Sequence, residues 1–105
     1  MERIHVNALK QRLERGSPMT LLDVREPWEY DICRIESSIN IPMSQIMNRV
    51  SELDKDAKLV LICHHGGRSF QVASYLESCG FNDMANLEGG VSAWAKEIDA
   101  SMPEY

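Results

Sequence analysis

One cysteine stands in a run of residue types that can do chemistry together, Cys63-His64-His65-Gly66-Gly67-Arg68-Ser69. The run follows the strongly apolar residues 58–62 and precedes an amphipathic segment, so it should join a buried strand to a helix. Its two glycines allow the backbone to fold tightly with N–H groups pointing inward, and the helix N-terminus adds partial positive charge at the same place. We therefore expect an anion-binding loop around Cys63.

The thiol of Cys63 is the expected nucleophile of this loop. Inward amides, the helix terminus and the Arg68 guanidinium should all favour the thiolate over the thiol. The same groups would stabilise a persulfide on the cysteine and the negative charge of an incoming donor such as thiosulfate. A cysteine at the end of a buried strand is often inert when taken alone. Here the series of two glycines, an arginine and a serine before a helix favours a functional site.

The elements that must position this loop alternate between short apolar strands and amphipathic helices. Strand character is found at residues 20–24, 38–41, 58–62 and about 83–87. Helical character is found at residues 7–16, 26–30, 44–53, 69–79 and 91–98. Helical crossovers imply parallel strands, whose carboxyl ends hold the ligand site. Trp28, Tyr75 and Trp94 fall at amphipathic positions and are expected in the core.

Composition excludes several classes of protein. The chain has 105 residues, with 11 Lys plus Arg against 16 Asp plus Glu, a net charge of -5 and 44% hydrophobic residues. This predicts a single folded domain over residues 1–105. The acidic balance argues against nucleic acid and against a membrane surface as partner. With no signal-like apolar start and no membrane-length apolar run, a cytoplasmic protein is expected.

The remaining cysteines and the histidines give weaker signals. Cys33, Cys63 and Cys79 are odd in number and lack CxxC spacing, which fits neither a disulfide framework nor a zinc site. We expect Cys33 to be buried with a packing role only. We expect Cys79 to lie at the far end of a helix, too far from Cys63 to form a disulfide. Adjacent residues such as His64 and His65 rarely share one tetrahedral ion, so they are expected at the loop surface. No metal and no cofactor is expected.

Taken in order, these segments resemble the rhodanese (thiosulfate sulfurtransferase-like) family over nearly the whole chain. The similar segments are the Asp-x-Arg of residues 21–26, the Asn-Ile-Pro of residues 39–42, the loop of residues 63–69 and the Gly-Gly-x-x-x-Trp of residues 87–94. The resemblance implies an α/β fold with a central, mostly parallel five-stranded sheet and helices on both faces.

The resemblance also implies an activity and a set of site residues. Cys63 would accept a sulfane sulfur, become a persulfide, and pass the sulfur to cyanide or a thiol in a ping-pong mechanism. Asp23 and Arg25 would support the loop from the neighbouring strand. Arg68 would help to bind a small anionic donor, and the acceptor could be a thiol or a sulfur-carrier protein. The residues expected to line the pocket are His64, His65, Gly66, Gly67, Arg68 and Ser69.

One segment departs from the family pattern. Residues 33–38 read Cys-Arg-Ile-Glu-Ser-Ser, where many members have two glycines and a histidine. Without glycine, a left-handed backbone conformation carries a cost. We expect this segment to be remodelled, or helped by the short side chains of Ser37 and Ser38.

Two other functions compete with sulfur transfer. A cysteine-dependent phosphatase or arsenate reductase uses a similar loop, but four residues separate Cys63 from Arg68, one fewer than the phosphatase pattern has. A non-catalytic rhodanese-like interaction module is the second alternative. Such modules commonly lack the cysteine, so its presence together with Gly66, Gly67 and Arg68 favours chemistry.

Overall fold

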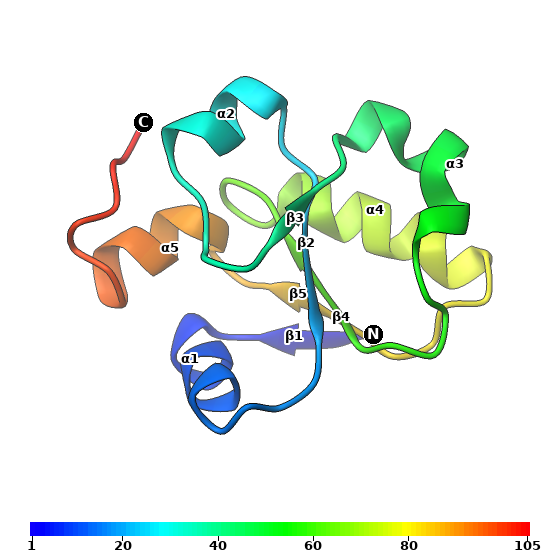
Figure 1. The fold of residues 1–105 in the computed structure, drawn as a ribbon, viewed down its shortest axis with the longest axis horizontal. Coiled ribbons are helices and arrows are strands. Elements are labelled where there is room, and N and C mark those ends of the chain that lie inside the picture. Colours follow the sequence, from blue (N-terminus) through cyan, green and yellow to red (C-terminus); the bar gives the residue numbers. More distant parts are fainter.

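The computed structural model describes all residues from 1 to 105 and is built around one five-stranded sheet (Figure 1). The strands are β1 (Glu2–Ile4), β2 (Thr20–Asp23), β3 (Ile39–Asn40), β4 (Leu59–Ile62) and β5 (Met84–Leu87). Their order in the sheet is β1-β5-β4-β2-β3, and every neighbouring pair is parallel. The predicted α/β fold with a central five-stranded sheet is confirmed, and the sheet is parallel throughout.

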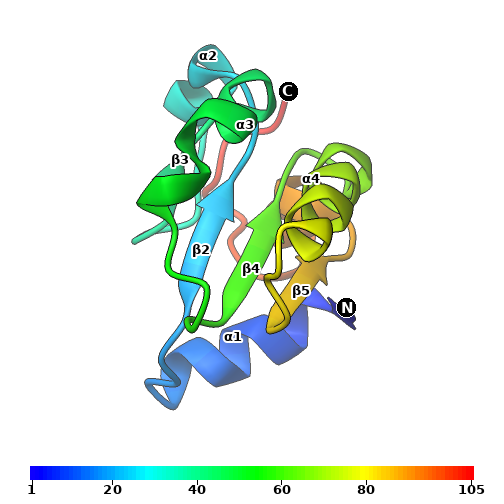
Figure 2. The same cartoon turned by 90° about the vertical axis from the view of Figure 1, so that its right-hand side faces the viewer.

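The helices cover both faces of this sheet and one of its ends. They are α1 (Val6–Glu14), α2 (Pro27–Ile32), α3 (Ile46–Arg49), α4 (Gly67–Ser78) and α5 (Gly90–Glu97), with two short 3₁₀ turns, η1 (Met43–Gln45) and η2 (Val50–Glu52). The two helices α1 and α5 pack on one face, whereas α3 and α4 cover the other. Figure 2 shows α2 beyond the carboxyl ends of the strands, where the site is expected. None of the helices has the length and apolarity needed to cross a lipid bilayer.

The central strand β4 explains why the core has two halves. Val60 and Ile62 belong to the cluster under α1 and α5, while Leu59, Leu61 and Cys63 belong to the cluster under α4. All five side chains are at most 1% exposed. A strand buried on both faces is expected in the middle of a parallel sheet. The alternation therefore directs the Cys63 side chain to the α4 side.

The N-terminal segment differs from the prediction in two respects. Residues 2–4 form β1, which the apolar pattern did not indicate because only Ile4 of the three is buried. Helix α1 begins at Val6, and its N-cap is His5, whose Nδ1 accepts from the backbone N–H of Asn7 at 3.3 Å. The helix therefore begins one residue before the start predicted from the sequence, residue 7.

The segment after Pro42 is not the single helix predicted from Ser44. It consists of η1, α3 and η2 in succession, and Ile46 is its only fully buried residue, while Met47 is 71% exposed. Val50 and Leu53 are half-buried and pack against the same core cluster as Ile46. The apolar spacing therefore identified side chains that pack on the core, Met47 excepted, but not the break of the backbone into three short turns.

The three aromatic residues expected in the core behave differently from one another. Trp94 is buried in the α5 face and Tyr75 is half-buried, but Trp28 is 60% exposed. Trp28 lies on α2, which sits past the end of the sheet and buries only Glu29. The prediction for Trp28 was wrong because α2 has no apolar layer beneath it.

The segment that departs from the family pattern keeps a tight turn without glycine. Ser37 adopts a left-handed backbone with φ of 68°. The hydroxyl of Ser38 donates to the carbonyl of Ile35 at 2.6 Å, and the Tyr30 hydroxyl donates to the carbonyl of Ser38 at 2.5 Å. The expectation that Ser37 and Ser38 help this turn agrees with the structure.

Candidate active site

The candidate nucleophile lies directly after β4, at the carboxyl edge of the sheet. Cys63 is 1% exposed. Its Sγ accepts a hydrogen bond from the backbone N–H of Gly66 at 3.0 Å and contacts the Ser69 hydroxyl at 3.3 Å. Gly66 has φ of 113°, the left-handed region that favours glycine, and immediately precedes α4. The loop therefore closes over the sulfur and presents donors to it.

Helix α5 fixes the other side of the loop. The N–H of Val91 donates to the carbonyl of Cys63, and the N–H of Ser92 donates to the carbonyl of His64, both at 3.0 Å. In a planar trans peptide the C=O and the next N–H point in opposite directions. The N–H groups of His64 and His65 therefore point away from α5, towards the side of the sheet on which the Cys63 sulfur lies.

Asn86 is a site residue that the sequence reasoning missed. It lies on β5 and is 1% exposed. Its Nδ2 donates to the carbonyl of Gly66 at 3.0 Å, and its Oδ1 accepts from the Ser69 hydroxyl at 2.5 Å. The signal that could have found it is a polar amide within an otherwise apolar strand. Asn86 ties the loop to the sheet at both ends of its tight turn.

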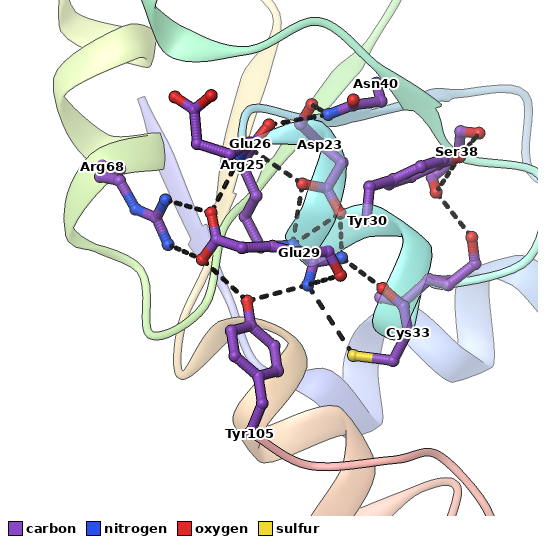
Figure 3. Close-up of polar contacts among 11 residues, drawn as sticks. Asp23, Arg25, Glu26, Glu29, Tyr30, Cys33, Ser38, Asn40, Arg68 and Tyr105 are labelled. Carbon is purple, nitrogen blue, oxygen red and sulfur yellow. Dashed lines mark hydrogen bonds and ion pairs between the residues drawn. The ribbon is translucent and has the colours of Figure 1, made fainter.

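Arg68 is paired with a carboxylate that was also missed. Its two Nη atoms lie 2.7 and 2.8 Å from the two carboxylate oxygens of Glu29, the one buried residue of α2 (Figure 3). The hydrogen bonds from Arg68 hold the pKa of Glu29 down at about 2, so this carboxylate is charged at neutral pH. Arg68 was expected to face the thiolate and the donor. Its guanidinium is instead directed at Glu29.

The predicted supporting residues form a buried ion pair beside this site. Asp23 and Arg25 are fully buried, with Arg25 Nη2 at 2.7 Å from Asp23 Oδ2. Arg25 also donates to the carbonyls of Cys33 at 2.6 Å and Glu29 at 3.2 Å. Burial opposes the charge of Arg25, but its hydrogen bonds to Asp23 and Tyr105 offset this and raise its pKa. The pair therefore anchors the carboxyl end of α2, and contacts the Cys63 loop only through other residues.

Tyr105 is one of those connecting residues. Its hydroxyl accepts from Arg25 Nη1 and donates to Glu29 Oε1, each at 3.0 Å (Figure 3). Its ring stacks on His64 with centroids 4.0 Å apart and planes 8° apart. Nothing in the sequence pattern indicated this residue, because a single aromatic beyond the last helix has no periodicity.

The two loop histidines occupy different environments. His65 is exposed, as expected, but His64 is half-buried between His65 and Tyr105. Burial, assisted by the neighbouring His65, lowers the pKa of His64. His64 is therefore more fully neutral at physiological pH than a free histidine. The other two thiols agree with expectation, since Cys33 is buried and Cys79 is half-buried, and both are free.

The chain belongs to the rhodanese-like domain family, whose model matches residues 5–97. It is 38% identical over 93 residues to a sulfurtransferase of Allochromatium vinosum, covering 89% of this chain and 87% of that protein. It is also 38% identical to the putative sulfurtransferase YtwF of Bacillus subtilis, covering 92% of this chain and 93% of the relative. A rhodanese-like domain protein from Staphylococcus aureus superposes with a TM-score of 0.86 at 34% identity, covering 93% of this chain and 95% of that one. Sulfur transfer in the general sense is the activity that these similarities support.

Some relatives are larger proteins that contain a similar domain. The probable adenylyltransferase/sulfurtransferase MoeZ of Mycobacterium tuberculosis is 36% identical, with 92% of this chain covering 25% of that protein. The putative sulfur carrier protein YrkF of Bacillus subtilis is 32% identical, with 91% of this chain covering 52% of it. The chain thus spans about a quarter of MoeZ and about half of YrkF.

Proposed function

We propose that this protein takes a sulfane sulfur from a donor such as thiosulfate and passes it to a thiophilic acceptor through a persulfide on Cys63. Cyanide is the acceptor suited to an assay, and a thiol or a sulfur-carrier protein is the acceptor in the cell. The similarity to a relative named a putative sulfur carrier protein, YrkF, supports the carrier-protein acceptor.

The first half-reaction forms one sulfur–sulfur bond and breaks another. The Cys63 thiolate attacks the outer sulfur of thiosulfate, and sulfite leaves with the electron pair of the old bond. In the second half-reaction the acceptor attacks the outer sulfur of the persulfide and returns Cys63 to the thiolate. No external oxidant or reductant is needed in either step.

The observation that carries the proposal is the arrangement of donors around the Cys63 sulfur. The Gly66 amide lies 3.0 Å from Sγ, and two hydrogen bonds from α5 turn the next two peptide N–H groups to the same side of the loop. Fixed dipoles of this kind stabilise a developing anion without reorganising during the reaction. We assign the lining of the pocket to the backbone from His64 to Ser69, and its support to Asp23, Arg25 and Asn86.

Mass spectrometry of the reduced protein tests this proposal. Thiosulfate should add the mass of one sulfur atom, and cyanide should then remove it. The Cys63→Ser variant should fold normally by circular dichroism and take up no sulfur, whereas Cys79→Ser should take it up like the unmodified protein. Loading of Cys63→Ser would show that another group is the nucleophile. A folded, unmodified protein that never gains sulfur would favour the interaction module.

A further inference from the structure

The charged side chains around the Cys63 loop cancel one another in pairs. Arg68 is matched by Glu29, and Arg25 is matched by Asp23. Each of these two arginines is thus bound to a carboxylate, and burial favours the neutral form of His64. The loop therefore offers peptide dipoles to an anion and no uncompensated cation.

The lack of an uncompensated cation affects the choice of donor, because sulfane-sulfur donors differ in charge. Thiosulfate is a dianion, whereas a persulfide of a small thiol carries at most one negative charge on its sulfur atoms. The protein has a net charge of -5. A dianion beside a neutral group of side chains therefore gains less electrostatic stabilisation than it would beside an unpaired arginine.

Glu29 is held in its pairing position by several contacts. Its Oε2 accepts from the backbone N–H of Glu26 at 2.9 Å, and its Oε1 accepts from the Tyr105 hydroxyl at 3.0 Å. The Glu29 side chain is only 6% exposed, against 35% for Arg68. The Glu29 carboxylate is thus held in place by its own contacts, and the more exposed Arg68 side chain pairs with it.

We infer that Glu29 is a specificity-determining residue, which neutralises Arg68 and so biases the site towards thiol persulfides over thiosulfate. This inference rests on the proposed sulfur transfer and names its preferred donor class. In the favoured reaction the Cys63 thiolate attacks the outer sulfur of R–S–SH. The new bond joins Cys63 Sγ to that sulfur, the old S–S bond breaks, and R–S⁻ leaves with the electron pair. The proton stays on the transferred sulfur, and nothing is oxidised overall.

The test compares the rates at which Cys63 gains sulfur from thiosulfate and from 2-hydroxyethyl persulfide, followed by quenched mass spectrometry. Because the two donors differ in intrinsic reactivity, the readout is the ratio of the rates in each variant. Glu29→Gln should raise the thiosulfate rate by about tenfold and change the persulfide rate by less than about twofold. Arg68→Gln should lower the thiosulfate rate by about tenfold, since Glu29 is then unpaired.

The double variant Glu29→Gln/Arg68→Gln separates charge cancellation from direct donor binding by Arg68. With both charges removed, the ratio should return to within about threefold of that of the unmodified protein. A double variant as selective against thiosulfate as Arg68→Gln alone would overturn the inference, because Arg68 would then bind the donor itself. The matched control is Glu52→Gln, which removes one carboxylate from the exposed bidentate pair with Arg49. It should leave the ratio unchanged.

The unmodified protein provides a test that does not depend on the folding of any variant. Between about 0.02 and 0.2 M salt, the thiosulfate rate should rise, because screening weakens the repulsion of a dianion by an acidic protein without a cationic site. A rate that falls with salt would overturn the inference. Persulfide loading without the expected change in ratio would overturn the donor preference alone, whereas a protein that no donor loads would overturn the proposed function as well.

Discussion

Gly90 lies directly against the carbonyl oxygen of Cys63, with no space for a side chain between them. A Cβ carbon on Gly90 would overlap that oxygen and would lie 2.6 Å from the carbonyl oxygen of His64, and Gly90 has φ of 54°. Both carbonyls are fixed in place by the first amides of α5. The helix can approach the loop this closely only because residue 90 has no side chain.

Replacing Gly90 by alanine should therefore displace the loop. The combined strain and overlap should lower the free energy of unfolding by about 2 kcal/mol or more and reduce sulfur loading of Cys63. Urea denaturation and the mass-spectrometric assay measure the two effects. Gly67→Ala serves as the stability control, since its φ is not positive and an added Cβ meets nothing within 4 Å. Equal stabilities of the two variants would contradict the role given to Gly90.

Asn86→Ala should loosen the turn at Gly66. It removes the side-chain amide that donates to the Gly66 carbonyl, which keeps the weaker bonds from Phe70 N–H and the Ser69 hydroxyl, and it removes the closest acceptor of that hydroxyl. A cost of about 1–3 kcal/mol in the free energy of unfolding is expected. Hydrogen exchange at Gly66 should also become faster. The control is Asn82→Ala, an exposed position just before β5, where a similar loss would speak against a specific role for Asn86.

Glu29 should make folding stability depend on pH in acid. Its pKa is lowered to about 2, chiefly by the hydrogen bonds from Arg68, against 4.5 for the ordinary side chain. Its contribution is therefore complete above about pH 4.5 and is lost as the pH falls through about 2. We expect this contribution to be about 2–3 kcal/mol, because Glu29 is nearly buried.

Urea denaturation between pH 2 and pH 6 checks this expectation. Glu29→Gln should be less stable than the unmodified protein at pH 6, and the difference should shrink towards pH 2. Glu52→Gln, which alters an exposed pair, should keep most of the acid dependence. A stability difference for Glu29→Gln that stays constant over this range would argue against the ion pair as its cause.

Removing the Tyr105 ring should raise the pKa of His64. Burial is the main cause of the lowered pKa of His64, and the Tyr105 ring covers one face of the imidazole. Tyr105→Ala exposes that face to water, so the charged imidazolium becomes less unfavourable. Titration of the His64 signals by NMR measures the shift. Tyr75→Ala removes a tyrosine from α4 and should leave this titration unchanged; a shift of equal size there would contradict the explanation.

The sequence allowed the fold and the loop to be predicted because both depend on local patterns. A strand apolar on both faces, a cysteine, a glycine pair and a helix are consecutive in the chain, and they meet at Cys63 as expected. A short motif also singled out Asp23 and Arg25, which the structure joins in a buried ion pair. These features need only a few neighbouring residues to be recognised.

The partners of the loop could not be predicted in the same way. Glu29 meets Arg68 across 39 residues of chain, and Tyr105 meets Glu29 across 76. Contacts between residues so far apart in the sequence produce no periodic pattern of residue types. Asn86 is an isolated amide in an apolar strand, a pattern with several explanations. Trp28 was misplaced because amphipathic spacing does not reveal that α2 lies past the end of the sheet.

The exposed imidazole of His65 has a practical consequence. The loop is held by main-chain hydrogen bonds to α5 and by Asn86. Residue 65 therefore contributes its peptide group to the loop, while its side chain is exposed. Changing that side chain removes the imidazole that stacks on His64 but none of these bonds. Substitutions confined to residue 65 would therefore vary the exposed surface beside Cys63 while keeping the main-chain hydrogen bonds that hold its sulfur.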